Sequence, residues 1–301
     1  MVMVGSYADL LSLGRSMTVE IAGQNCKIYY YYYDSNYIQV PVLLLHGVNG
    51  NCRNFDSLAL FLISNGFNII TLDYPGRGNS EYLKDKELYI HDVYLCVIRD
   101  LLQSLEIKKV YCVGTSLGGL LALQLYKKGV KVKALVLNDI GPYVPIERQK
   151  KLAGYLYNNY VKFNTLKEVS KYIRFAYAMS GIDLEQDWRH LIRYSVHKEN
   201  NGSFILSYDK LVVDKLYEDS VSGEVIDLWD DWRYLQYKKV PVQVIRGGLS
   251  SLFTTDVLTK MQEIKPDTDV VTFDSLGHAP MLTDIIQKEY ILKFLKNIFL
   301  H

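Results

Sequence analysis

Ser116 stands in a sequence pattern that can turn a serine into a nucleophile. It lies in Gly114-Thr115-Ser116-Leu117-Gly118, directly after the apolar run VYCV (residues 110–113) and directly before the apolar helical run LLALQLY. Glycines on both sides allow a tight strand-to-helix turn, which lifts the serine hydroxyl above the edge of a sheet. The pattern predicts acyl-transfer chemistry with Ser116 as the attacking group.

A serine hydroxyl is a poor nucleophile until a base removes its proton, and a histidine is the usual base. His278 lies in SLGHAP (residues 275–280), a loop with a glycine beside the histidine, after the last predicted strand. The other five histidines lie in the loop below the expected oxyanion site, in a predicted helix, in the irregular middle segment or at the C-terminus: His46, His91, His190, His197 and His301. We therefore predict His278 as the base.

The developing negative charge on a substrate oxygen needs hydrogen-bond donors. Ser116 precedes a predicted helix, where unpaired backbone N–H groups favour negative charge, so the Leu117 amide is one donor. The run VLLL (residues 42–45) is followed by His46-Gly47-Val48. The Val48 amide is the second expected donor of this oxyanion hole.

The elements that must position these residues alternate in type along the chain. A hairpin is predicted from strands 17–21 and 26–33 with its turn at 23–25. Further strands are predicted at 42–45, 68–72, 110–113, 132–137, 242–245 and 269–273, and helices at 55–64, 90–105, 117–127, 256–264 and 285–299. Strands that alternate with helices indicate a mostly parallel sheet flanked by helices, an α/β fold.

Residues 143–237 break this alternation. They are rich in tyrosine and charge, have helical periodicity and contain one possible short strand at 204–207. Inserted helices of this kind sit over the carboxyl ends of parallel strands, where ligands bind. We expect a helical lid inserted after the sixth strand, which divides the chain into core residues 1–142, lid residues 143–237 and core residues 238–301.

Five segments together resemble the α/β-hydrolase family, over a range from about Leu43 to Phe299. They are LLLHGVNGN, TLDYPGRGNS, VGTSLGG, VLNDIGP and SLGHAPML, in the family's order. The resemblance implies Ser116 as nucleophile, His278 as base, and Val48 and Leu117 as oxyanion donors. It also implies that Asp73 and residues 76–80 are structural turn residues that line the site.

The sequence departs from the family at the acid that orients the histidine. The segment RGGLSSLF (residues 246–253) places Ser251 where an aspartate is usual. Asp139, at the end of the sixth strand, is the preferred substitute, because some dehalogenases and lipases of the family take their acid from that strand end. Asp139 could instead cap its own turn. Asp256 and Asp274 are weaker candidates, and a site without an acid is the remaining alternative.

The expected function is that of a serine hydrolase that cleaves carboxylic esters or related acyl compounds through an acyl-enzyme, with no metal and no cofactor. Dehalogenase and epoxide-hydrolase activities are disfavoured, because those relatives carry an aspartate at the position of Ser116. Hydrolysis of C–C bonds, peptides or thioesters stays open. A ligand-binding or regulatory protein with little turnover is the alternative, and Ser251 is the observation in its favour.

Composition excludes other classes of partner. Of 301 residues, 49% are hydrophobic and 22% charged, and 34 basic against 33 acidic residues leave a net charge of +1. This near-neutral balance does not indicate binding to nucleic acid or to an anionic membrane, and no apolar run is long enough to span a bilayer. Four cysteines without a CxxC pair indicate neither a zinc site nor a disulfide framework. We expect a cytoplasmic protein with a small-molecule acyl substrate.

Overall fold

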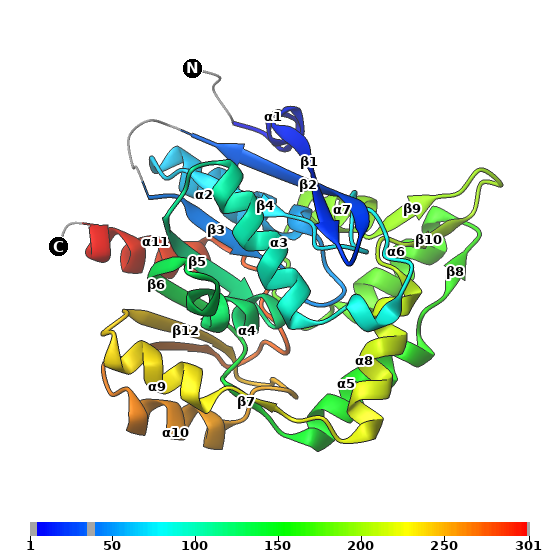
Figure 1. Cartoon of the computed structure of the whole chain (residues 1–301). Coiled ribbons are helices and arrows are strands. Elements are labelled where there is room, and N and C mark those ends of the chain that lie inside the picture. The colour runs from blue at the N-terminus through cyan, green and yellow to red at the C-terminus, as the bar shows by residue number, and fades with distance from the viewer. Residues whose placement is uncertain (1–4, 35–39, 300–301) are drawn as a thin grey trace.

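The computed structural model describes residues 5–34 and 40–299. Its centre is an eight-stranded sheet in the order β1-β2-β4-β3-β5-β6-β12-β13 (Figure 1). The strands are β1 (Gly14–Ile21), β2 (Gln24–Tyr33), β3 (Val42–Leu45), β4 (Ile69–Leu72), β5 (Lys109–Thr115), β6 (Lys131–Asn138), β12 (Val242–Gly247) and β13 (Asp269–Phe273). β2 pairs antiparallel with β1 and β4, and the other neighbours are parallel. The predicted mostly parallel sheet is confirmed.

β1 and β2 form the predicted hairpin with a tighter turn than expected. Ile21 pairs with Gln24, which leaves Ala22 and Gly23 as the turn. Their φ values are 49° and 77°. Two consecutive positive φ angles match the right-handed twist of the flanking strands, and glycine adopts them at little cost. The turn therefore lies one residue earlier than the predicted 23–25.

Helices cover both faces of the sheet. One face carries α2 (Asp56–Ser64) and α11 (Ile285–Phe299), and the other carries α3 (His91–Ser104), α4 (Leu117–Gln124), α9 (Trp229–Tyr237) and α10 (Thr255–Ile264). Successive strand residues point to opposite faces. In β3, Val42 and Leu44 therefore pack toward α2 and α11, whereas Leu43 and Leu45 pack toward α3 and α4.

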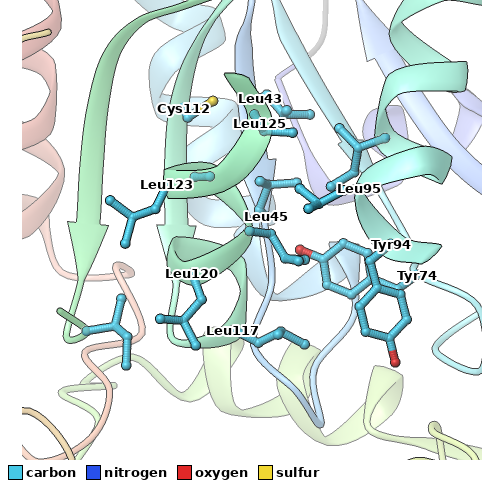
Figure 2. Close-up of a cluster of buried hydrophobic side chains, with 14 of the residues drawn as sticks. Leu43, Leu45, Tyr74, Tyr94, Leu95, Cys112, Leu117, Leu120, Leu123 and Leu125 are labelled. Carbon is cyan, nitrogen blue, oxygen red and sulfur yellow. The ribbon is translucent and has the colours of Figure 1, made fainter. Parts of the chain in front are cut away.

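The packing between the sheet and α4 fixes the start of that helix. Figure 2 shows Leu45 and Cys112 from the sheet, Leu120 and Leu123 from α4, and Tyr94 beside them, all buried in one cluster. Burying such side chains stabilises the layer by roughly 1.5–3 kcal/mol each. The helix terminus that follows Ser116 is thereby held rigidly against the sheet.

The chain between β6 and β12 leaves the sheet and builds small elements of its own. They are β7 (Tyr143–Val144), α5 (Ile146–Asn158), β8 (Lys162–Phe163), α6 (Leu166–Ala176), α7 (Glu185–Tyr194), β9 (Val196–Lys198), β10 (Phe204–Leu206), α8 (Lys210–Ser222) and β11 (Ile226–Asp227), followed by α9. β8, β10 and β9 form a three-stranded sheet, and β11 pairs with β7. The possible short strand at 204–207 is present as β10, whereas β7, β8, β9 and β11 were not predicted. Strands of two or three residues are too short to show an alternating pattern.

Two further helices, α1 and α9, pack against helices that cover the sheet. α1 (Tyr7–Ser12), which the sequence analysis missed, contacts α2 and begins with a reciprocal cap between Ser6 and Asp9. α9 contacts α4 and α10, and the Trp232 indole donates a hydrogen bond to the Met261 carbonyl. Within residues 5–34 and 40–299, no helix is long and apolar enough to cross a membrane.

Candidate active site

Ser116 lies at the turn from β5 to α4. Its φ and ψ are 51° and −117°, a conformation that L-residues avoid and that costs of order 1–3 kcal/mol. The backbone can fold this tightly only without neighbouring side chains, because a Cβ atom on Gly118 would lie 1.9 Å from the Leu45 carbonyl oxygen. Ser116 N–H donates to the Asn138 carbonyl oxygen at 3.1 Å. Ser116 thus lies at the carboxyl end of β5, in the tight strand-to-helix turn that the glycine pattern predicts.

His278 reaches Ser116 from the loop after β13. Its Nε2 atom lies 3.0 Å from Ser116 Oγ. The loop is held in place from outside the sheet, since Gly277 N–H donates to the Met179 carbonyl oxygen at 2.8 Å. The distance between Nε2 and Oγ is within the range for proton transfer between a base and a nucleophile.

Asp139 completes a chain of hydrogen bonds with these two residues. It follows β6 directly, has a φ of 56° and is fully buried. Its Oδ2 atom lies 2.7 Å from His278 Nδ1, and its Oδ1 atom accepts the Gly247 N–H at 2.7 Å. Because the carboxylate faces Nδ1, the imidazole proton rests there and Nε2 is left to accept the serine proton.

The other residues considered for the acid lie elsewhere. Ser251 is exposed, and its carbonyl oxygen accepts a hydrogen bond from Arg148 at 2.8 Å. Asp256 is exposed in the first turn of α10, and Asp274 is exposed at the start of the His278 loop. Among the described residues, the His278 ring bonds to Asp139 and Ser116 alone.

The two amides expected to hold an oxyanion are free of protein partners. Gly47 lies against Ser116, since a Cβ atom on it would be 3.7 Å from the Ser116 Cβ. In the part of the chain that the structure describes, neither the Val48 N–H nor the Leu117 N–H donates to another residue. Both residues line one cavity of about 410 Å³. Two free donors beside a serine hydroxyl suit a carbonyl oxygen that gains negative charge.

His46 supports the loop that carries Val48. Its Nε2 atom accepts the Tyr74 N–H at 3.3 Å, and its Nδ1 atom lies 2.8 Å from the Gly47 carbonyl oxygen. Burial lowers the pKa of His46 to about 3. The ring is therefore neutral, donates through Nδ1 and ties two loops together, so its role is structural.

Asp73 also supports the loop that carries Val48, through hydrogen bonds to backbone N–H groups. Its two carboxylate oxygens accept the N–H groups of Cys52 at 2.7 Å and Asn79 at 2.8 Å. The side chain is fully buried, and burial raises its pKa. A Cβ atom on Gly78 would lie 2.2 Å from an Asp73 oxygen, which explains the glycine there. Asp73 and its turn thus hold the loop that carries Val48.

The sequence analysis missed Asn138. This residue is buried, and its Nδ2 atom donates to Thr115 Oγ1 at 3.0 Å and to the Pro280 carbonyl oxygen at 2.8 Å. One side chain therefore joins the residue before Ser116 to the loop that carries His278. No sequence signal separates this asparagine from an ordinary turn residue, because both partners lie far away in the chain.

Two cavities reach the site. The smaller one, about 140 Å³, contains Ser116 and His278 and is walled by Leu152, Tyr155 and Tyr177 from the segment between β6 and β12. The larger one contains Val48 and Leu117 but neither Ser116 nor His278. Within the described residues, no group of three or more His, Cys, Asp or Glu side chains is arranged to hold a metal ion, and all four cysteines are free thiols.

Comparison with known proteins identifies the family. The family model of the alpha/beta hydrolase fold matches residues 40–285. A 3-hydroxybutyrate-oligomer hydrolase of Cupriavidus necator is 28% identical over 246 residues, 80% of this chain and 83% of that protein. A Drosophila melanogaster protein named "Probable serine hydrolase" is 32% identical, over 85% of this chain and 81% of that protein. The crystal structure of an α/β hydrolase from Novosphingobium aromaticivorans superimposes with a TM-score of 0.82 at 26% identity, over 94% of this chain and 98% of that one. The chain therefore belongs to the α/β-hydrolase family, and the prediction that it is a hydrolase is confirmed.

Proposed function

We propose that this protein is a serine hydrolase that cleaves carboxylic esters or related acyl compounds through an acyl-enzyme. The observation that carries the proposal is the continuous hydrogen-bonded chain from Asp139 through His278 to Ser116. The relatives named as a 3-hydroxybutyrate-oligomer hydrolase and as lipases support an ester as the substrate class. The mechanism uses no metal and no cofactor.

In the first half of the reaction, His278 Nε2 removes the proton of Ser116 Oγ as that oxygen attacks the substrate carbonyl carbon. The carbonyl oxygen becomes an oxyanion between the amides of Val48 and Leu117. Asp139 stabilises the imidazolium that forms. When the intermediate collapses, the bond to the leaving alcohol breaks, and the alcohol takes the proton from His278.

In the second half, a water molecule gives a proton to His278 Nε2 and attacks the acyl carbon. The bond to Ser116 Oγ breaks, the serine recovers its proton and the carboxylic acid leaves. Asp139 keeps the ring in one tautomer through both halves, because its Oδ1 atom is anchored by Gly247 and its Oδ2 atom faces Nδ1.

The 143–237 segment serves as the lid in this proposal. Its α5 and α6 supply Leu152, Tyr155 and Ala176 to the wall of the cavity that contains Ser116. It is also attached to the loops of the site, since the Asn51 side chain donates to the Tyr194 carbonyl oxygen at 2.8 Å. Residues 1–142 and 238–301 would then form the core that carries the catalytic groups. The lid would determine which substrates bind. The cytoplasmic location stays a prediction.

The alternative, a ligand-binding protein with little turnover, rested on Ser251. The contact of 2.7 Å between Asp139 Oδ2 and His278 Nδ1 supports Asp139 as the acid in place of Ser251, and so favours turnover over this alternative. Cleavage of C–C bonds, peptides and thioesters would use the same residues. We place esters first because of the named relatives.

The test is turnover of p-nitrophenyl esters from acetate to long acyl chains by the wild type, Ser116→Ala and Asp139→Asn. The proposal expects activity in the wild type and its collapse in Ser116→Ala. Full activity in Ser116→Ala would refute the serine mechanism. An inert wild type across the whole panel would favour the ligand-binding alternative.

A further inference from the structure

The larger cavity extends from the oxyanion donors away from the catalytic histidine. It is lined by Val48 and Leu117, whereas the smaller cavity is lined by Ser116, His278 and also Val48. A leaving alcohol must stay near His278 to receive its proton, so the alcohol belongs in the smaller cavity. The acyl arm of the substrate then points past Val48 and Leu117 into the larger one.

Arg77 lies in the wall of this larger cavity and is only 1% exposed. Its Nε atom donates to the Val48 carbonyl oxygen at 3.1 Å, and its Nη1 atom donates to the Pro75 carbonyl oxygen at 2.8 Å and to Tyr94 Oη at 2.7 Å. Its guanidinium also lies 5.5 Å and 4.9 Å from the ring centres of Tyr89 and Tyr94.

Arg77 forms no ion pair with a carboxylate of the described residues, and the Asp209 carboxylate near it accepts a hydrogen bond at 2.7 Å from Tyr89, whose ring lies against the guanidinium. Within residues 5–34 and 40–299, the Nη2 atom of Arg77 donates to none of the described groups. The other deeply buried arginine, Arg53, is paired with Asp56. A buried cation without an anionic partner is costly unless a ligand supplies the missing charge.

The acidic residues that line the cavity are exposed or paired with lysines. Asp92 is exposed and paired with Lys128, and Asp219 is paired with Lys215. Glu224 and Asp227 are also exposed, where solvent and salt screen their charge. The wall of the cavity therefore carries a buried guanidinium that forms no ion pair with the described residues, beside apolar side chains such as Val212 and Leu216.

We propose that the larger cavity binds acyl groups that end in a carboxylate, with the carboxylate on the Nη2 atom of Arg77 and the scissile carbonyl oxygen between Val48 and Leu117. The substrates would be half-esters of dicarboxylic acids or other ω-carboxyacyl esters. This inference rests on the proposed function. It adds a binding role to Arg77, which also positions the Val48 carbonyl group.

The experiment compares mono-p-nitrophenyl adipate with its methyl ester, which has nearly the same shape but no charge, after subtraction of the rates without enzyme. The wild type should prefer the carboxylate in kcat/KM by at least about 10-fold, the size expected for one charge-assisted hydrogen-bonded contact. In Arg77→Gln, the ratio between the two esters should fall to one or below. Arg77→Lys should retain part of the preference.

The ratio is the decisive quantity, because loss of the bond from Arg77 to Val48 slows both esters alike. Arg148→Gln is the matched control, since Arg148 is exposed on α5 and should leave the ratio as in the wild type. A wild type that cleaves the neutral ester through Ser116 but shows no preference for the anion would overturn this inference and leave the proposed function standing.

A binding measurement covers the cases in which turnover gives no answer or Arg77→Gln does not fold. Calorimetric titration of Ser116→Ala should show tighter binding of monomethyl adipate than of dimethyl adipate, and Arg77→Lys in the same background should reduce the difference. Equal binding of the two esters would contradict the role of Arg77. If the wild type is inert but this difference is found, the proposed function fails while the anion site stands.

Discussion

Asp139 and His278 are joined by a hydrogen bond, with 2.7 Å between Oδ2 and Nδ1, although they are 139 positions apart in the chain. The carboxylate is fully buried, and Gly247 N–H holds its other oxygen. This pair supports Asp139 as the acid in place of Ser251. A serine at the usual acid position is compatible with the proposed mechanism, in which the acid is Asp139 at the end of β6.

Asp139→Asn should lower kcat by about 10³–10⁴-fold, the scale seen when the equivalent carboxylate of a serine protease loses its charge. The amide cannot stabilise the imidazolium and can present its NH₂ group to Nδ1, which favours the wrong tautomer. Steady-state kinetics with a p-nitrophenyl ester measure the effect, and circular dichroism checks the fold. A kcat within tenfold of the wild type would remove Asp139 from the catalytic group.

Ser251→Ala should leave kcat within about twofold of the wild type. Ser251 is exposed, and the bond from Arg148 uses its backbone carbonyl oxygen, which the substitution keeps. Exposed substitutions away from special features usually change stability by less than about 0.5 kcal/mol. A loss of activity comparable to that of Asp139→Asn would mean that the hydroxyl takes part in the site after all.

Asn138→Ala should lower kcat more than it raises KM, by roughly 10–100-fold in kcat, because the side chain positions the loop of His278 and contacts no substrate. It should also destabilise the fold by about 1–3 kcal/mol, since the Pro280 carbonyl group loses its buried donor. Kinetics and urea unfolding separate the two effects. A change confined to KM would contradict a positioning role.

Gly118→Ala should destabilise the protein by at least about 3 kcal/mol or prevent folding, because the added Cβ atom would lie 1.9 Å from the Leu45 carbonyl oxygen. The matched control is Gly154→Ala in α5, where no atom lies within 4 Å of the new Cβ. That variant should gain up to about 1 kcal/mol from helix propensity. Urea unfolding of both measures the difference, and similar stabilities would refute the close approach.

The free energy of unfolding should fall as the pH drops from 7.5 to 5, in part because of His46. Its pKa is about 3 in the folded protein against 6.5 for the free side chain, so between these values the unfolded chain binds the proton and the folded protein does not. The stabilisation is complete above pH 6.5 and decreases below it, by about 2 kcal/mol at pH 5.

His46→Gln isolates this contribution because glutamine does not titrate. The variant should be less stable than the wild type at pH 7.5, since it loses the bonds to Tyr74 and Gly47, yet it should lose less stability between pH 7.5 and 5. Urea unfolding at the two pH values tests it. Equal losses in both proteins would show that His46 takes up a proton while folded.

Local patterns in the sequence predicted the parts of the fold that depend on neighbours in the chain. The glycines around Ser116, the apolar run of β3 and the period of α11 each lie within a few residues and follow from sterics and burial. The boundaries of β3, β13 and α11 match the predicted ones. Asp139 could be preferred because it ends the sixth strand, the place from which some dehalogenases and lipases of the α/β-hydrolase family take their acid.

The features that escaped prediction depend on contacts between distant segments. Asn138 gains its importance from Pro280, and Arg77 from Val48, Tyr94 and a cavity that the sequence does not outline. The strands β7, β8, β9 and β11 are stabilised by pairing and not by their own periodicity. α1 carries a local signal, the reciprocal cap between Ser6 and Asp9, which apolar periodicity alone does not reveal.

The most direct test of the central claim is to mix the protein rapidly with p-nitrophenyl acetate, follow p-nitrophenolate and identify the acylated residue by mass spectrometry after acid quench. The account predicts a burst of about one product per active site and an acetyl group on the peptide that contains Ser116. The burst and the label should vanish in Ser116→Ala. Turnover that persists in Ser116→Ala, with no acetyl group on that serine in the wild type, would contradict the account.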